Sequence, residues 1–211
     1  MGPQVKKGCI VMARRTHEII GEFYPQYHDI QSYPQDKVAV IRKAEEEWGI
    51  LGNMPKCAIT VDGVEFPSSE HIFQIMKFSD TAARKELLAD KSGFAMKKFT
   101  MKRLLKAGAK CREDWEEHLL DIMKFALVKK YEQSEFFRTE LQRTAELGLF
   151  IAEDETSRQK GKPADCWGVV LQDGAYVGSN VLGRLLMELR DAGGKLEYRL
   201  PEEMTSFTDL K

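Results

Sequence analysis

A mostly helical α+β fold, in a single domain with short strands and hairpins, is predicted by three features of the sequence. Short runs of β-branched and aromatic residues are interrupted by turn-forming Asp-Gly pairs. Several longer segments repeat their apolar residues at helical spacing. The regular alternation of strand and helix that builds a parallel sheet is absent. A length of 211 residues, with 43% hydrophobic and 31% charged residues, suits one globular domain.

Two hairpins and two single strands account for the predicted β-structure. The first hairpin covers residues 57–66 and turns at Asp62-Gly63, a pair that suits a type I′ turn. The second covers residues 167–177 and turns around 172–174. Single strands are predicted at residues 38–41 and 149–152, and a polar loop is predicted at residues 153–163.

Five helices are predicted, at residues 69–78, 80–89, 113–131, 134–145 and 180–191. A serine hydroxyl at 68 or 69, the carboxylate of Asp80 and the amide of Asn180 are expected to cap the first, second and last of them. The segment 113–131 has apolar residues on nearly every side, so this helix is expected at the centre of the protein.

The predicted domain boundaries follow from these elements. Residues 1–37 are expected to form an irregular or partly helical extension packed on the domain, residues 38–195 the catalytic domain, and residues 196–211 a tail. The apolar run at 9–13 is too short for a secretory signal, and no stretch approaches the roughly 20 apolar residues of a membrane helix. We therefore expect a cytoplasmic protein with no membrane contact.

The four cysteines predict reduced thiols and no metal site. Cys9, Cys57, Cys111 and Cys166 are widely separated, form no CxxC pair and have no histidine at ligand spacing. No cofactor is expected either.

A polar face on the helix that begins near Ser69 is the first candidate site. At about 100° per residue, Glu70, Gln74 and Lys77 fall on one side, and apolar residues occupy the opposite side. This arrangement would present a carboxylate, an amide and an amine from a helix docked on the core. The alternative is an ordinary solvated face.

The helix that begins at Asn180 is the second candidate. Free backbone N–H groups at a helix start suit a phosphate, and Gly183 in the first turn could allow a ligand to approach closely. Tight packing of the helix is the alternative explanation of Gly183.

The third candidate is the segment 165–168, Asp-Cys-Trp-Gly. A carboxylate beside an indole could place a charge near a sugar and stack a base, although a tryptophan in the core is the alternative.

A basic segment is the fourth candidate in a chain whose net charge is only −1. Residues 97–112 contain seven lysines and arginines and no acidic residue, and from them we predict Lys102, Arg103 and Lys106 as nucleic-acid contacts. The alternative is a solvated helix surface.

Four blocks of this chain, at residues 49–54, 66–78, 165–168 and 178–190, resemble in order and spacing the signature blocks of the NADAR (NAD- and ADP-ribose-associated) family. The resemblance spans about residues 38–191. It implies cleavage of a bond between a ribose anomeric carbon and a nitrogen. One branch of the family acts on phosphorylated riboflavin-pathway intermediates, and another removes ADP-ribose from guanine bases.

This chain resembles the guanine branch more closely, through residues 41–43, 92–115 and 181–190. Gly52 stands where a serine is usual, and Cys166 replaces the aromatic residue that usually precedes Trp167. The segment 74–78 resembles the other branch more. These departures affect the expected substrate more than the expected reaction.

The resemblance implies roles for individual residues. Glu70 is expected to stabilise an oxocarbenium-like state or activate water, and Asp165 to act as a second carboxylate. Lys77 or Lys43 would neutralise a diphosphate or form a Schiff base with an opened ribose. Arg190 would pair with phosphate or with Glu70. The expected ligand-binding residues are Asn53, Ser69, Gln74, Trp167, Gly168, Asn180, Gly183 and Arg190.

The predicted function is hydrolytic removal of ADP-ribose from guanine in nucleic acid, so the expected partners are an ADP-ribose-containing substrate and nucleic acid. One alternative is an N-glycosidase of phosphorylated riboflavin-pathway intermediates. Another is a non-catalytic module that binds ADP-ribose or NAD derivatives, against which the presence of Glu70 and Asp165 argues. The basic segment favours the nucleic-acid substrate.

Overall fold

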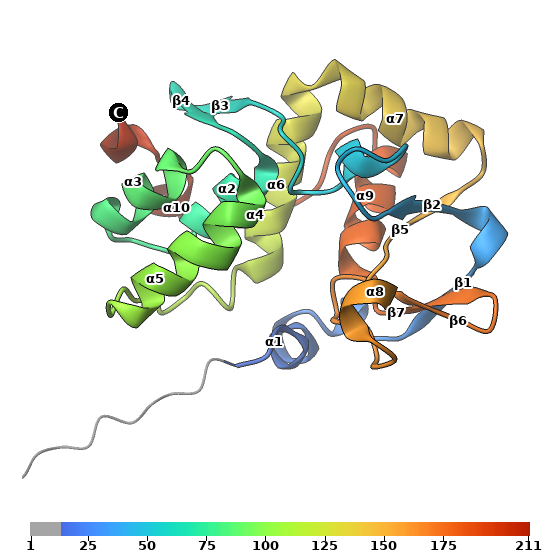
Figure 1. Cartoon of the computed structure of the whole chain (residues 1–211). Helices are drawn as coiled ribbons and strands as arrows, with labels where there is room; N and C mark the ends of the chain where they lie inside the picture. The colour runs from blue at the N-terminus through green and yellow to red at the C-terminus, as the bar shows by residue number, and fades with distance from the viewer. Residues whose placement is uncertain (1–13) are drawn as a thin grey trace, which may run out of the picture.

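The computed structural model describes residues 14–211, and the predictions for Cys9 and for the apolar run at 9–13 lie outside this range. It has the predicted α+β architecture in one domain (Figure 1). Helices α2 (Ser69–Ile75), α3 (Thr81–Ala89), α4 (Gly93–Ala95) and α5 (Met101–Lys106) gather on one side. The sheets that contain residues 31–41, 150–153 and 170–178 lie on the other side with α8 (Thr156–Gln159), whereas the hairpin at residues 59–66 lies on the helical side. No helix in the described range is long and apolar enough to cross a membrane.

Both predicted hairpins are present, and their turns explain the Asp-Gly pairs. Strands β3 (Ile59–Val61) and β4 (Val64–Phe66) are joined by Asp62 and Gly63, whose φ angles are 51° and 77°. Strands β6 (Val170–Gln172) and β7 (Ala175–Gly178) are joined by Asp173 and Gly174, with φ angles of 47° and 80°. Two successive residues with positive φ are what a type I′ turn requires.

The predicted single strands pair with each other in parallel. Strand β2 (Val38–Ile41) runs beside β5 (Phe150–Glu153), so that Ile41 lies opposite Glu153. Helix α9 (Val181–Asp191) packs on β5. At Gly183 a Cβ atom would collide with the carbonyl oxygen of Ile151. Close packing of α9 on β5 therefore accounts for this glycine.

Residues before the first predicted strand contribute a helix, in line with the expected partly helical extension, and a strand that the sequence did not indicate. Helix α1 (Thr16–Phe23) buries Ile19 and Ile20 completely. Strand β1 (Gln31–Pro34) pairs antiparallel with β7 and makes the third strand of that sheet.

The central helix α6 (Leu119–Gln133) is buried as predicted but begins six residues late. Residues 113–118 form turns instead, and there the guanidinium of Arg112 holds Asp114 through two hydrogen bonds of 3.0 Å. Helix α7 (Glu135–Glu146) follows α6. The short helix α8 lies where a loop was predicted, and the carboxylate of Asp154 accepts the Thr156 N–H at its start.

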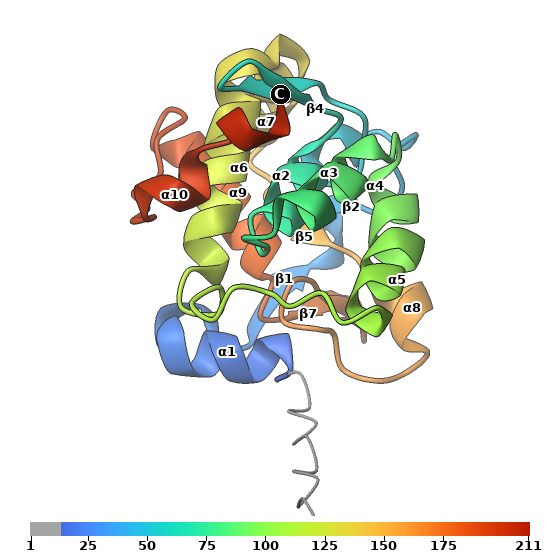
Figure 2. The same cartoon turned by 90° about the vertical axis from the view of Figure 1, so that its left-hand side faces the viewer.

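The C-terminal segment packs against the helical side (Figure 2). Helix α10 (Glu202–Thr205) and the turn after it bury Met204, Phe207 and Leu210. The buried guanidinium of Arg84 on α3 bonds Asp209 at 3.0 Å and the carbonyl of Ser206 at 2.8 Å.

Candidate active site

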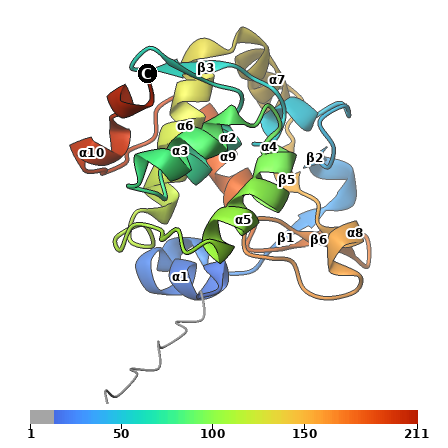
Figure 3. The ribbon, with the colours of Figure 1, turned by 60° about the vertical axis from the view of Figure 1, so that its left-hand side comes forward.

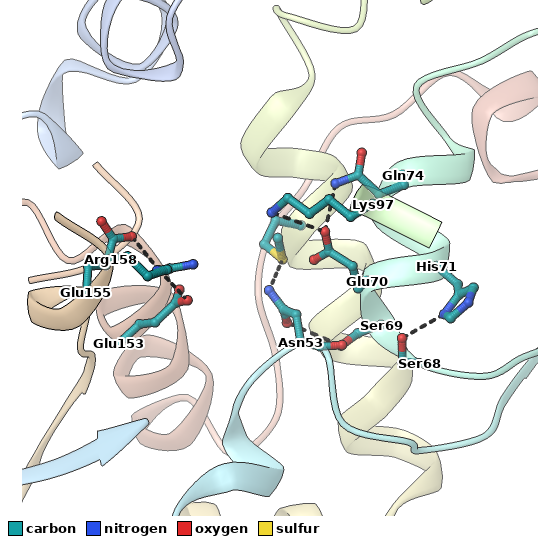
Figure 4. A network of polar contacts seen from close by, with 11 residues as sticks. Asn53, Ser68, Ser69, Glu70, His71, Gln74, Lys97, Glu153, Glu155 and Arg158 are labelled. Carbon is teal, nitrogen blue, oxygen red and sulfur yellow. Dashed lines mark hydrogen bonds and ion pairs between the residues drawn. The ribbon is translucent and has the colours of Figure 1, made fainter. Parts of the chain in front are cut away.

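Glu70 is the centre of the candidate site. Helix α2 is buried along its whole length, and Glu70 is only 3% exposed, so the alternative of a solvated polar face is wrong. The Oε1 atom of Glu70 accepts a hydrogen bond of 2.7 Å from the Gln74 amide and lies 3.4 Å from the Nζ of Lys97 (Figure 4). Neither contact uses Oε2, so this second oxygen keeps its capacity to accept a hydrogen bond.

The start of α2 is held by a neighbouring loop and not by a serine cap. The Ser68 hydroxyl pairs with the His71 ring at 2.8 Å, which corrects the predicted capping role. The backbone N–H of Glu70 donates to the Asn53 carbonyl at 3.1 Å, and the Ser69 hydroxyl donates to the Asn53 side chain at 3.2 Å. Asn53, Ser69 and Glu70 are therefore one connected group.

A buried lysine fixes the loop that carries Asn53. The Nζ of Lys130, on α6, donates to the carbonyls of Ile50 at 2.6 Å and Gly52 at 2.7 Å. Complete burial lowers the pKa of Lys130 to about 8. Both of its hydrogen-bond partners are backbone carbonyls of this loop, so Lys130 positions the loop.

Lys77 lies in an aromatic cage beside Glu70. Its Nζ is 4.2 Å from the ring centre of Phe73 and 4.9 Å from that of Trp115. Burial is the main cause that lowers the pKa of Lys77 to about 8, with the positive charge of Lys97 acting in the same direction and Glu70 opposing it. An amine with this pKa can carry a charge or act as a nucleophile near neutral pH.

A second group of charged residues faces Glu70 from β5 and α8. Glu153 ends β5, and Figure 4 shows Glu153 and Arg158 pointing toward the Glu70–Lys97 pair from the opposite side. Arg158 bonds both Glu153, at 3.0 Å, and the buried Glu155, at 2.9 Å. The guanidinium of Arg158 thus forms ion pairs with two carboxylates.

Burial, and then the nearby charge of Glu155, raise the pKa of Glu153 against the opposing effect of Arg158. Glu70 and Lys97 also act on it, from across the site. A carboxyl with a raised pKa is suited to donate a proton. The sequence reasoning missed Glu153, although its position directly after a predicted strand was an available signal.

Gly168 lets this second group form. A Cβ atom there would collide with the carbonyl of Glu153 and lie 2.8 Å from a side-chain carbon of Glu155. Close packing therefore accounts for Gly168 without a ligand. Asp165 is exposed: its backbone N–H donates to Glu155 at 2.7 Å, and its carboxylate accepts the N–H of Cys166 at 2.7 Å.

Trp167 connects the 165–168 segment to the Glu70 helix. Its ring meets Phe73 edge to face, with ring centres 5.7 Å apart, and part of the side chain remains accessible. Because Phe73 also contacts Lys77, the indole borders the aromatic cage.

Three predicted site residues lie elsewhere. Lys43 is exposed and its Nζ lies 4.0 Å from Glu46. The predicted pair of Arg190 with Glu70 is wrong, because Arg190 bonds Asp191 at 2.7 Å, Thr144 at 3.0 Å and the Leu149 carbonyl. Asn180 is completely buried, and its amide donates to the Ile151 carbonyl at 2.8 Å.

The backbone N–H groups at the start of α9 already have hydrogen-bond partners, so the predicted anion site is wrong. Asn180 has a φ of 51° and makes no capping bond. The N–H groups of Val181 and Leu182 donate to the carbonyls of Cys166 and Trp167, at 3.0 and 3.1 Å. These donors tie the helix to the 165–168 segment and are not free for a phosphate.

The basic segment reaches the site through Lys97. It follows α4, contributes to a π-helical turn (Met96–Thr100) and to α5, and exposes Lys102, Arg103 and Lys106. Arg103 forms an ion pair of 2.7 Å with Glu86, so its charge is partly neutralised. Within residues 14–211, no group of three or more His, Cys, Asp or Glu side chains could hold a metal ion.

A family model described as the NADAR domain matches residues 39–192. The chain belongs to the NADAR family. It is 32% identical to the N-glycosidase YbiA of Escherichia coli over 163 residues, which cover 77% of this chain and 92% of YbiA. It is 28% identical to a riboflavin biosynthesis protein of Vibrio vulnificus over 187 residues, which cover 88% of this chain. The chain spans about half, 46%, of that longer protein.

The NMR structure of Escherichia coli YbiA is also similar, with a TM-score of 0.59 at 30% identity, over 80% of this chain and 92% of YbiA. Fold and sequence therefore agree on the family. The N-glycosidase names within it support the enzyme class predicted from the sequence, a hydrolase of N-glycosidic bonds.

Proposed function

We propose that this NADAR protein hydrolyses the bond between the anomeric carbon of ADP-ribose and a nitrogen of guanine in nucleic acid. The observation that carries the proposal is the state of Glu70. Glu70 is a buried carboxylate whose Oε1 atom is held by Gln74 and Lys97. Its Oε2 atom takes part in neither contact, and the side chain faces Glu153 across the site.

The reaction follows from these two carboxyl groups. As the bond between C1′ and nitrogen breaks, its electron pair goes to nitrogen, and positive charge develops on C1′ and the ring oxygen. The free Oε2 of Glu70 stabilises that charge or takes a proton from the attacking water. Glu153, whose pKa is raised by burial, delivers the proton that nitrogen requires. The products are free ADP-ribose and the unmodified base.

The aromatic residues and Lys77 supply binding in this scheme. Trp167 offers an accessible indole on which a base can stack. Lys77 lies close enough to Glu70 to neutralise a phosphate or to trap an opened ribose as a Schiff base. Asn53, Ser69 and Gln74 hold Glu70 and the loop beside it.

The basic segment favours a polymeric substrate. Lys97 is part of both the site and the segment, so a strand bound along the exposed lysines would lead directly to Glu70. A small riboside would leave Lys102 and Lys106 without a role. Apart from the substrate, the proposed hydrolysis consumes only water. We still expect the protein in the cytoplasm.

A second candidate is favoured by the names of the relatives. An N-glycosidase and a riboflavin biosynthesis protein are both similar to this chain. Cleavage of a phosphorylated riboflavin-pathway intermediate would use the same Glu70 and Glu153, with Lys77 beside the phosphate. A binding module without activity is less compatible with the paired carboxyl groups.

The test offers the purified protein three substrates: single-stranded DNA with ADP-ribose on guanine, phosphorylated riboflavin-pathway intermediates, and NAD. Products are identified by mass spectrometry. We expect ADP-ribose and intact guanine from the DNA, at a rate well above turnover of the other two. Rapid cleavage of the riboflavin intermediates with intact modified DNA would establish the second candidate instead.

A further inference from the structure

Two exposed phenylalanines stand on the helix that supplies Lys97. Phe94 is 59% and Phe99 is 60% exposed, although large aromatic side chains are ordinarily buried. Figure 3 turns this helix, which runs from α4 through the π-helical turn to α5, toward the viewer. Its opposite side is anchored in the core by Met96, Met101 and Leu104.

The π-helical turn brings the two rings to the same side. Phe94 and Phe99 are five residues apart, and in a regular α-helix they would point about 140° away from each other. The turn between them has hydrogen bonds to the fifth residue, such as that from the Met101 N–H to the Met96 carbonyl, which widens the helix locally. As a result, one lysine contacts both rings: the Nζ of Lys98 lies 5.2 Å from the ring centre of Phe94 and 5.4 Å from that of Phe99.

The surroundings of the two rings are positively charged. Residues 97–112 contain no acidic residue. Among the residues the structure describes, Lys98, Lys102 and Lys106 have no ion-pair partner, whereas Arg103 is paired with Glu86. A partner for this face must therefore bring both negative charge and flat apolar surfaces.

We propose that this face, Phe94 and Phe99 with Lys98 and Lys102, binds a single-stranded segment of the nucleic-acid substrate beside the modified nucleotide. Unpaired bases stack on the two rings, and the phosphates lie against the lysines. A duplex is disfavoured because its bases are already stacked and their faces are closed to the rings. The inference rests on the proposed nucleic-acid function, and it specifies the substrate as single-stranded.

The experiment measures binding of unmodified DNA by fluorescence anisotropy, so that it does not depend on catalysis. A 12-nucleotide single strand and the corresponding duplex are compared at one salt concentration. Phe94→Ala and Phe99→Ala are the test variants. The matched control is Phe136→Ala on α7, where the replaced ring is 61% exposed but lies outside the basic face.

We expect the wild-type protein to prefer the single strand. Each test variant should weaken single-strand binding by about fivefold or more, the lower limit for losing one stacked base. Phe136→Ala should leave it within twofold, and the melting temperatures of all three should agree. Equal affinity for duplex and single strand, or unchanged binding in both test variants, would overturn the proposal.

Two further outcomes separate this surface from the proposed function. Ring-dependent binding of a single strand by a protein that fails to cleave ADP-ribosylated DNA would support the surface and reject the proposed reaction. Cleavage of ADP-ribosylated guanine in a mononucleotide, without measurable binding of single strands, would support the reaction and reject the surface.

Discussion

The ammonium group of Lys97 lies 3.4 Å from Oε1 of the buried Glu70, although the two residues come from different helices. Lys97 is half exposed, with 53% of its side chain accessible, and Glu70 retains only 4%. A surface cation thus neutralises a carboxylate inside the site. This contact joins the basic helix to the group proposed to act on the anomeric carbon.

Replacing Glu70 with glutamine tests the charge directly. Glutamine keeps the size and can still accept the Gln74 hydrogen bond, but it cannot stabilise positive charge. We expect kcat to fall by about 10²- to 10⁴-fold while ligand binding is largely kept. Glu65→Gln, on the exposed side of β4, is the matched control and should retain full activity. A Glu70→Gln variant with more than half the wild-type rate would remove Glu70 from the mechanism.

Glu153 should make stability and activity depend on pH. Its folded-state pKa is raised above 4.5, so the folded protein keeps a proton that the unfolded chain has already lost. This contribution to stability is present at low pH and is lost as the pH rises through the folded-state pKa. The melting temperature of Glu153→Gln, relative to wild type, should therefore increase from pH 4.5 upward.

The same variant tests the proton donor. Wild-type kcat should decline on the alkaline side as Glu153 ionises, and Glu153→Gln should be slow at all pH values, with no such decline. If kcat of the variant declines at high pH as in the wild-type protein, another group donates the proton.

Lys77 offers a test of covalent chemistry. Its pKa of about 8 leaves part of the amine neutral near pH 7.5, as nucleophilic attack on an opened ribose aldehyde requires. We expect cyanoborohydride, added with substrate, to leave a stable mass adduct on wild type and none on Lys77→Met. If no adduct forms and Lys77→Arg remains active, the amine acts only through its charge.

Trp167 should bind ligand by stacking. Trp167→Leu should weaken ADP-ribose binding by about tenfold, within the roughly 1–3 kcal/mol of one base–aromatic contact, and should change the melting temperature little. Calorimetric titration and thermal unfolding measure the two effects. If the variant loses much thermal stability but its folded fraction binds ADP-ribose normally, Trp167 contributes to the core through Phe73 and does not bind the ligand.

Local sequence patterns were sufficient for the hairpins and for the Glu70 helix. Positive φ at Asp62 and Gly63 follows from residue type, and the alignment of Glu70 with Gln74 follows from helical spacing. Asn180 shows the limit of such reasoning. Its residue type suits a helix cap, but β5 draws its amide toward Ile151, and this tertiary contact was not visible in the sequence.

The facing half of the site could not be predicted for the same reason. Lys97 belongs by composition to a basic surface, and only packing of α4 against α2 brings it to Glu70. Glu153 closes a strand whose partner, β2, lies more than a hundred residues earlier in the chain. The direction of the Glu153 carboxylate depends on this long-range strand pairing. The pairing could not be predicted from a single sequence.

The last prediction concerns the lysines that a nucleic-acid backbone would contact. Lys102 and Lys106 are exposed on α5, and neither forms an ion pair within residues 14–211. Removing one lysine–phosphate pair should lower the salt slope of single-strand binding by about 0.7. Replacing both lysines with glutamine should therefore weaken binding at low salt and flatten its dependence on salt concentration.

The control for this experiment is Lys195→Gln, which removes one exposed lysine outside the basic segment and is compared with Lys102→Gln or Lys106→Gln alone, so that the net charge changes equally. Its slope should match that of the wild-type protein. Arg103→Gln should have a smaller effect than Lys102→Gln or Lys106→Gln, because Glu86 already neutralises part of the Arg103 charge. Equal flattening by Lys195→Gln and by the α5 variants would mean that net charge, and not this face, attracts the strand.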